Sequence, residues 1–200
     1  MNPYNFLKFL ENTVNKKTPF QIKWTKFRDT ITKEDLNVEG SVDFTLNREL
    51  KTLPDNLTVS KDLRLSYTNI PELPRNLKVG ENLWLSFSKI TKIPEDLQVG
   101  GILDLSNTSY IRHLPSNFKV DNLYLSGSSI GHLPENLTAT YLLDIRNTSI
   151  SEIPKNLKTY SFYTTGSELD KMYSEAEIRK MIKERGGSVE RIYGSAKAAS

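Results

Sequence analysis

Apolar and polar positions recur along the chain with a period of roughly 20 residues, which lies within the range of solenoid repeats. Each repeat has an apolar–polar–apolar triplet such as Leu63-Arg64-Leu65, a Thr or Ser three residues later, and an apolar residue two positions further on. A Leu-Pro or Ile-Pro pair follows, and these pairs begin at Leu53, Leu73, Ile93, Leu114, Leu133 and Ile153. So regular a period predicts a solenoid, because one coil cannot bury its own apolar face and must stack on its neighbours.

Each segment of the repeat predicts a local structure. The alternating triplet predicts a short strand whose two leucines point inward. The next inward position holds a hydroxyl, and because a buried polar group needs a partner, we expect it to bond the backbone of the neighbouring coil. These hydroxyls belong to Thr68, Ser88, Thr108, Ser128 and Thr148. Proline turns the chain, and the pairs Val79-Gly80 and Val99-Gly100 allow a tight return. A first coil over 34–50 lacks the proline, which gives six coils and a degenerate seventh.

This pattern resembles the leucine-rich repeat family. Leu63, Leu65, Thr68, Ile70 and their equivalents carry the resemblance, although the family usually has Asn where this chain has Thr or Ser. The short repeat length with Leu-Pro is similar to the short bacterial subclass, and the V-G-x-L-x-L-S-x-T variant is similar to repeats common in tailed-phage and bacterial genomes. The resemblance covers residues 34 to about 165. It implies an α/β solenoid, a curved array with short parallel strands, and a protein-binding role.

The chain ends depart from the repeat, so we predict three segments. Residues 1–30 form an N-terminal helical and basic cap, 31–165 the repeats, and 166–200 a C-terminal helix–strand cap and tail. We expect helical caps at both ends because terminal coils would otherwise expose their core. A helix is predicted over 3–16, a strand over 20–24, a helix starting at a Ser174–Glu177 capping box and ending at Gly186-Gly187, a strand over 189–193 and disorder over 195–200.

Composition narrows the functional classes. The chain has no cysteine, which excludes disulfides, thiolate zinc sites and a cysteine nucleophile, including that of the ubiquitin-ligase domains that some bacterial relatives append. Neither a secretory signal nor an apolar run of roughly 20 residues is present, so we expect a soluble protein in the cytoplasm, or in the host cytoplasm or a virion if it is phage-encoded. No cofactor and no enzymatic activity are predicted, and the sequence does not indicate an oligomeric state.

The candidate site is the row of residues between the inward leucines, which should face outward on the concave strand surface. The row comprises Asp43, Arg64, Trp84, Asp104, Tyr124 and Asp144. Trp, Tyr and Arg are enriched in binding hot spots, so we predict that Trp84 and Tyr124 bind a protein partner, with Arg64, Asp104 and Asp144 giving charge complementarity. Tyr67 and Phe87 lie just past the strand and extend this patch. Alternatively, Trp84 packs against a terminal segment that folds over the strand face.

Other interpretations stay open at this stage. The basic ends suit packing into a larger assembly such as a virion. They also suit nucleic acid, because Lys8, Lys16, Lys17, Lys23, Lys26 and Arg28 lie among Phe9, Phe20, Trp24 and Phe27. His113, His132 and Glu152 share a position in three successive coils and could bind a metal, and Asp104 with Asp144 could form a widely spaced hydrolase pair. Earlier coils hold Thr52, Glu72 and Lys92 at the histidine position, which favours an ordinary exposed row.

Overall fold

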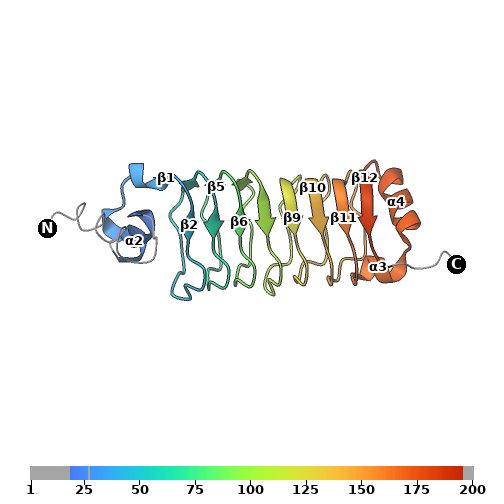
Figure 1. The fold of residues 1–200 in the computed structure, drawn as a ribbon, viewed down its shortest axis with the longest axis horizontal. Helices are drawn as coiled ribbons and strands as arrows, with labels where there is room; N and C mark the ends of the chain where they lie inside the picture. Colours follow the sequence, from blue (N-terminus) through green and yellow to red (C-terminus); the bar gives the residue numbers. More distant parts are fainter. Residues whose placement is uncertain (1–18, 27, 196–200) are drawn as a thin grey trace.

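The chain folds into a parallel β-solenoid of short coils. The structure, a computed structural model, describes residues 19–26 and 28–195. Eight parallel strands lie side by side in the order of the chain and form one long sheet (Figure 1). These are β2 (Val42–Asp43), β4 (Leu63–Arg64), β6 (Leu83–Trp84), β8 (Ile102–Asp104), β9 (Lys119–Tyr124), β10 (Thr138–Asp144), β11 (Lys158–Tyr163) and β12 (Ser188–Tyr193).

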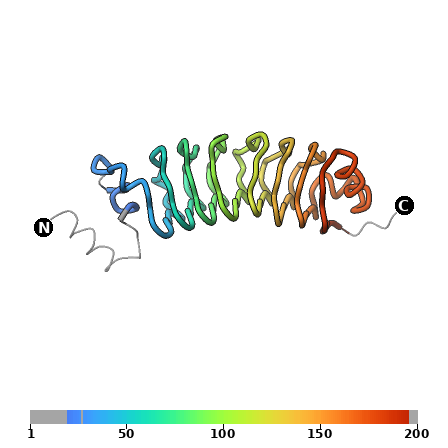
Figure 2. The backbone as a smooth tube through the Cα atoms, turned by 90° about the horizontal axis from the view of Figure 1, so that it is seen from above, coloured from blue at the N-terminus to red at the C-terminus, as the bar shows by residue number. Residues whose placement is uncertain are grey.

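A second, four-stranded parallel sheet runs beside the first through the early coils. Its strands are β1 (Asn37–Val38), β3 (Thr58–Val59), β5 (Lys78–Val79) and β7 (Gln98–Val99). From β9 onward a single longer strand replaces the two short ones, since Lys119 and Val120 already pair with Thr138 and Ala139 of β10. The coils follow one another along a gently curved line (Figure 2). Each coil therefore advances the long sheet by one strand.

The apolar positions of the repeat form one continuous core. Leu63, Leu65 and Ile70 are fully buried, and so are their equivalents in the following coils. The predicted inward direction of both leucines of the triplet is therefore confirmed. Each coil buries the apolar edge of the next, so stability is approximately a sum of nearest-neighbour terms.

The buried hydroxyls do not bond the neighbouring coil, and that prediction is wrong. Thr68 Oγ1 donates to the Leu65 carbonyl of its own coil at 2.7 Å, and Thr108 and Thr148 donate in the same way at 2.6 Å. Hydroxyls commonly bond a backbone carbonyl three residues earlier, which satisfies the group locally. Ser88 and Ser128, at the same position, have buried hydroxyls without a partner among the described residues.

Asparagine side chains form hydrogen bonds from one coil to another, and we call this row of bonded amides the asparagine ladder. Asn56, Asn76, Asn117, Asn136 and Asn156 all adopt positive φ, between 55° and 63°, in the turn after proline. Their amides bond from coil to coil: Asn76 to Asn56 at 3.0 Å, Asn136 to Asn117 at 2.7 Å and Asn156 to Asn136 at 2.8 Å. Asparagine suits this position because it tolerates the left-handed conformation better than most side chains do.

The glycine of the Val-Gly pairs is required by close contact between coils. A Cβ on Gly80 would lie 2.1 Å from the Ser60 carbonyl oxygen, and one on Gly100 would lie 2.1 Å from that of Gly80. Neither glycine has positive φ. The return is therefore tight because neighbouring backbones touch, and no side chain has room at these points.

The N-terminal described segment is a helix rather than the predicted strand. Residues Pro19–Lys26 form α2, and the 3-10 turns η1 (Arg28–Thr30) and η2 (Glu34–Leu36) lead into the first coil. Phe20 and Trp24 lie four residues apart on one helix face and are buried in the core, and Trp24 Nε1 donates to the Thr52 carbonyl at 2.9 Å. Five alternating residues are too few to separate the two periods, so the strand prediction is wrong. The predicted helix over 3–16 lies outside the described residues.

The C-terminal described segment follows its prediction closely. After α3 (Glu168–Met172), α4 (Glu175–Glu184) begins with the Ser174–Glu177 capping box and buries Ile178 and Ile182. Gly186 has a φ of 78°, and β12 then joins the long sheet beside β11. Ser195 is held by Asp170, through its backbone N–H at 2.7 Å and its hydroxyl at 2.6 Å, so the disorder expected from residue 195 does not extend to Ser195.

Candidate binding surface

The predicted outward row is aligned across the long sheet. Strand pairing places Asp43 beside Arg64, Arg64 beside Trp84, Trp84 beside Asp104, Asp104 beside Tyr124 and Tyr124 beside Asp144. Parallel strands lie about 4.8 Å apart, so neighbours in this row are within side-chain contact distance. We call the surface formed by this row and its continuation over β11 and β12 the sheet face.

Two tyrosines continue the row beyond the predicted limit. Tyr163 pairs with Asp144, and Tyr193 pairs with Tyr163. Their rings stack with 4.4 Å between centroids and 17° between planes. The sequence contains the signal, because Ser161-Phe162-Tyr163 aligns with Leu142-Leu143-Asp144 once the strand is recognised. The decay of the repeat after Ile153 obscures it.

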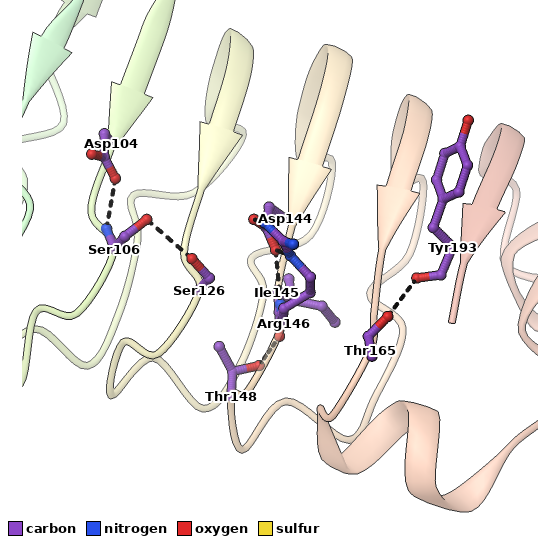
Figure 3. A network of polar contacts seen from close by, with 9 residues as sticks. All are labelled: Asp104, Ser106, Ser126, Asp144, Ile145, Arg146, Thr148, Thr165 and Tyr193. Atoms are coloured by element: carbon purple, nitrogen blue, oxygen red, sulfur yellow. Dashed lines mark hydrogen bonds and ion pairs between the residues drawn. The ribbon is translucent and has the colours of Figure 1, made fainter. Parts of the chain in front are cut away.

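The carboxylate of Asp144 forms an ion pair with an arginine of its own coil. Its two carboxylate oxygens accept from Arg146 Nε at 2.9 Å and Nη2 at 2.7 Å, and Oδ1 also accepts the Arg146 backbone N–H (Figure 3). The Asp144 side chain is 1% exposed. The hydrogen bond to Asp144 raises the pKa of Arg146. A carboxylate held in this way positions a guanidinium on the surface and is poorly placed to exchange protons with a substrate.

Asp104 occupies the equivalent position two strands away, but its coil lacks the arginine. Where Asp144 has Arg146, Asp104 has Ser106, whose backbone N–H donates to Asp104 Oδ1 at 2.9 Å. The Ser106 hydroxyl instead accepts from Ser126 at 3.2 Å (Figure 3). No basic side chain among the described residues pairs with Asp104. Asp62, two residues before Arg64 in the same coil, differs from Asp104 because it has a basic partner. Its carboxylate accepts from the Arg64 guanidinium at 2.8 Å and from the Asn82 amide at 2.9 Å.

Aromatic rings flank Asp104 on both neighbouring strands. Trp84 is half-buried, and its indole N–H is buried with no acceptor among the described residues. Tyr124 is also half-buried; burial raises the pKa of its phenol, and the charges of Asp144 and Asp104 raise it further. The middle of the sheet face thus combines two aromatic side chains with one carboxylate that has no counter-ion in the described chain.

Tyr67 and Phe87 lie at the turn just past the strands, as predicted, and they adopt an unusual backbone. Both are exposed and both have positive φ, 59° and 57° respectively. Leu46 has the same conformation one coil earlier and is 64% exposed. Later coils fill this position with Asn107, Gly127, Asn147 and Gly166, which tolerate positive φ more readily. We call Leu46, Tyr67 and Phe87 the apolar edge.

The described terminal segments do not cover the middle of the row. Helix α2 lies beyond β2 at one end of the array, and α4 lies beyond β12 at the other (Figure 1). The alternative in which Trp84 packs against a terminal segment therefore finds no support from residues 19–26 or from residues 164–195.

The other candidate residues are distributed as follows. Phe20 and Trp24, considered for base stacking, are buried, and Lys23 is paired with Asp35 at 2.6 Å. Lys8, Phe9, Lys16, Lys17 and Phe27 lie outside the described residues. His113, His132 and Glu152 are not gathered into a site: within the part of the chain that the structure describes, no three His, Asp or Glu side chains come together to hold a metal.

Comparison with known proteins adds no relative. No family model matches the chain, and no curated protein matches it. Among residues 19–26 and 28–195, no helix has the length and apolar character that crossing a bilayer requires.

Proposed function

We propose that the chain is a non-enzymatic interaction module that binds a protein partner on its sheet face. The observation that carries the proposal is the alignment of Trp84, Tyr124, Tyr163 and Tyr193 on the same side of adjacent or next-adjacent strands. Large rings are not needed there for folding, since Asp43 and Arg64 occupy the same position in other coils. Aromatic side chains supply much of the binding energy in protein interfaces.

The same proposal assigns the coil to the leucine-rich repeat class. The buried Leu-x-Leu triplets, the one strand that each coil adds to the long sheet and an asparagine-rich turn support that assignment. On this view α2, with Phe20 and Trp24 buried against the first coil, and α4, with Ile178 and Ile182 buried against β12, serve as caps at the two ends. A solenoid needs such caps because its terminal coils would otherwise expose apolar side chains. A cytoplasmic location belongs to the proposal and is consistent with a sequence that contains no cysteine.

Affinity capture from a lysate of the source cells tests the function. The bait is the full chain, compared with a Trp84→Ala/Tyr124→Ala variant whose folding is verified by its melting curve. A protein that the native chain captures and the variant loses supports the sheet face as the binding surface. A Tyr110→Ala/Tyr141→Ala variant is the matched control, because these tyrosines are 55% and 59% exposed and lie outside the row. Equal capture by the native chain and the Trp84/Tyr124 variant contradicts the proposal and favours assembly through the ends or edges.

A further inference from the structure

Among the described residues, two carboxylates of the sheet face are paired with an arginine of their own coil, whereas Asp43, at the end of the row, and Asp104, in its middle, are not. Asp62 is paired with Arg64, and Asp144 is paired with Arg146. Asp104 has the same backbone position as Asp144, but Ser106 replaces the arginine. A carboxylate without a counter-ion in the described chain thus lies in the middle of the row, between positions where the chain supplies its own.

The neighbours of Asp104 are suited to a cation. Trp84 and Tyr124 pair with Asp104 from either side, so a carboxylate lies between two rings on strands about 4.8 Å apart. Aromatic faces attract cations through the ring quadrupole, and a guanidinium can stack on a ring while its N–H groups bond a carboxylate. The chain itself uses this combination nearby, where the guanidinium of Arg146 is bonded to Asp144 and lies 5.6 Å from the Tyr163 ring centroid.

Trp84 has no evident role in folding that another residue could not fill. The equivalent positions of other coils hold Asp, Arg and Tyr. Its indole N–H is buried without an acceptor among the described residues, and a buried unpaired donor destabilises the fold. A tryptophan at this point is therefore more readily explained by what it contacts in a complex.

We propose that Trp84, Asp104 and Tyr124 form a receptor for an arginine side chain of an extended segment of the partner. The guanidinium would bond Asp104 as Arg146 bonds Asp144, and it would lie against the rings of Trp84 and Tyr124. The negative potential that Asp104 and Asp144 create at the Tyr124 phenol is consistent with this charge preference. This inference rests on the proposed function, because it assigns a ligand chemistry to the same surface.

The test uses two peptides of nearly equal size and shape, of which one carries guanidinium groups and the other neutral urea groups. Acetyl-(Gly-Arg)₃-amide and its citrulline counterpart, acetyl-(Gly-Cit)₃-amide, are titrated at low salt into the full chain labelled with ¹⁵N. The chain has two tryptophans, Trp24 and Trp84, so the two indole resonances give a probe and a reference. Trp24 is buried and donates to Thr52, and its resonance should stay fixed.

We expect the arginine peptide to shift the Trp84 resonance and the citrulline peptide to leave it unchanged. In Asp104→Asn the affinity should fall about fivefold, because the variant loses a partly exposed charge pair but keeps the cation–π contacts with Trp84 and Tyr124. Glu152→Gln removes an equal charge from an exposed position outside the sheet face and should have no effect. Asn is close in shape to Asp, so in the Asp104→Asn variant the side-chain oxygen can still accept the Ser106 backbone N–H. The melting curve of the variant verifies its fold.

Three results would overturn the arginine receptor: equal shifts from both peptides, unchanged affinity in Asp104→Asn, or no Trp84 shift at millimolar peptide. The arginine receptor and the proposed function can fail separately, and the experiments distinguish the two cases. A partner that is lost by Trp84→Ala/Tyr124→Ala and retained by Asp104→Asn would leave the sheet face as the binding surface and reject the arginine. Arginine-specific shifts together with equal partner capture by the Trp84/Tyr124 variant would reject the proposed function.

Discussion

The rings of Tyr67 and Phe87 stack on adjacent coils with 4.7 Å between their centroids and 7° between their planes, although both residues have a left-handed backbone. A bulky residue in this conformation costs about 1–3 kcal/mol, whereas glycine does not bear this cost and asparagine bears less of it. The chain places Asn107 and Gly127 at the same point of the following coils. The apolar edge therefore combines backbone strain with exposed apolar surface, which favours a role in binding over one in folding.

Replacing both rings by asparagine tests that interpretation. In Tyr67→Asn/Phe87→Asn, the relief of strain is only partial, because asparagine bears part of the same cost, and it should roughly offset the lost stacking, worth about 0.5–1.5 kcal/mol. We expect the free energy of unfolding, measured by urea denaturation, to change by no more than about 1 kcal/mol, the typical worth of one aromatic pair. A loss clearly larger than the worth of that pair would show that the rings stabilise the coils. The comparison variant is Asn147→Tyr, which places a ring in the same left-handed backbone beside Gly127 and Gly166, where no ring can stack on it, and should be destabilised.

The close contact at Gly100 predicts an intolerant position. Gly100→Ala places a methyl group 2.1 Å from the Gly80 carbonyl oxygen, and because that atom belongs to the backbone, the coils must separate. Forced shifts of this kind cost about 1–3 kcal/mol. Gly131→Ala is the matched control, because its Cβ would meet only the Ser149 hydroxyl at 3.6 Å. Urea denaturation should show a clear loss for the first variant and little change for the second; equal effects would contradict the contact.

The asparagine ladder can be separated into its backbone and amide contributions at Asn136. Its amide donates to Asn117 and accepts from Asn156, and its φ is 59°. Asn136→Gly keeps the conformation and loses the two exposed hydrogen bonds, at a cost of about 1 kcal/mol. Asn136→Ala loses the bonds and strains the backbone, at about 2 kcal/mol or more. Equal unfolding free energies for the two variants would show that the left-handed backbone is not the reason for asparagine.

Asp170 predicts a pH dependence of stability. Burial alone would raise the pKa of this carboxyl, but hydrogen bonds from Ser195, Gly166 and Thr164 outweigh burial and lower it. A lowered pKa in the folded state means that the contribution to stability is present above the pKa of an unfolded aspartate, about 3.9. It is lost as the pH falls through the lower pKa of the folded protein.

Asp170→Asn should therefore be less stable than the native chain at pH 7, by about 2 kcal/mol for hydrogen bonds to a charged group. The difference between the two melting temperatures should narrow as the pH is lowered below about 4, because the unfolded aspartate is then protonated, and it should vanish once the pH is below the lowered pKa of the folded carboxyl. Glu152→Gln is the control, because this carboxylate is exposed and forms no ion pair among the described residues, so its loss should change the melting temperature little. A stability difference for Asp170→Asn that does not depend on pH would contradict the assigned cause.

The coil was predictable from the sequence because its signal is repeated in every turn. The alternation of Leu63 and Leu65 recurs from coil to coil, so burial, strand direction and register follow from one pattern. The same register predicts that Trp84, Asp104 and Tyr124 share one row, and strand pairing confirms it. Contacts made once per chain were less predictable. The helical packing of Phe20 and Trp24 depends on tertiary contacts with the first coil, and five residues of local pattern do not contain that information.

The polar contacts were harder to predict than the apolar ones. The Thr68 hydroxyl could donate a hydrogen bond to a backbone carbonyl of its own coil or of the neighbouring coil. Only the three-dimensional geometry decides between these two acceptors. The pairing of Asp144 with Arg146, and the lack of such a pair at Asp104 among the described residues, likewise depends on side-chain direction. Tyr163 and Tyr193 were missed because the repeat decays ahead of them, although the strand pairing continues through both.

Oxidative footprinting of the captured complex tests the central claim most directly. Hydroxyl radicals modify exposed aromatic side chains, and mass spectrometry gives the rate at each one with and without the partner. Binding on the sheet face predicts a several-fold slower modification of Trp84 and Tyr124, with Tyr110, which is exposed and outside the row, unchanged. Protection of Tyr110 with unaltered rates at Trp84 and Tyr124 would place the partner elsewhere and contradict the account.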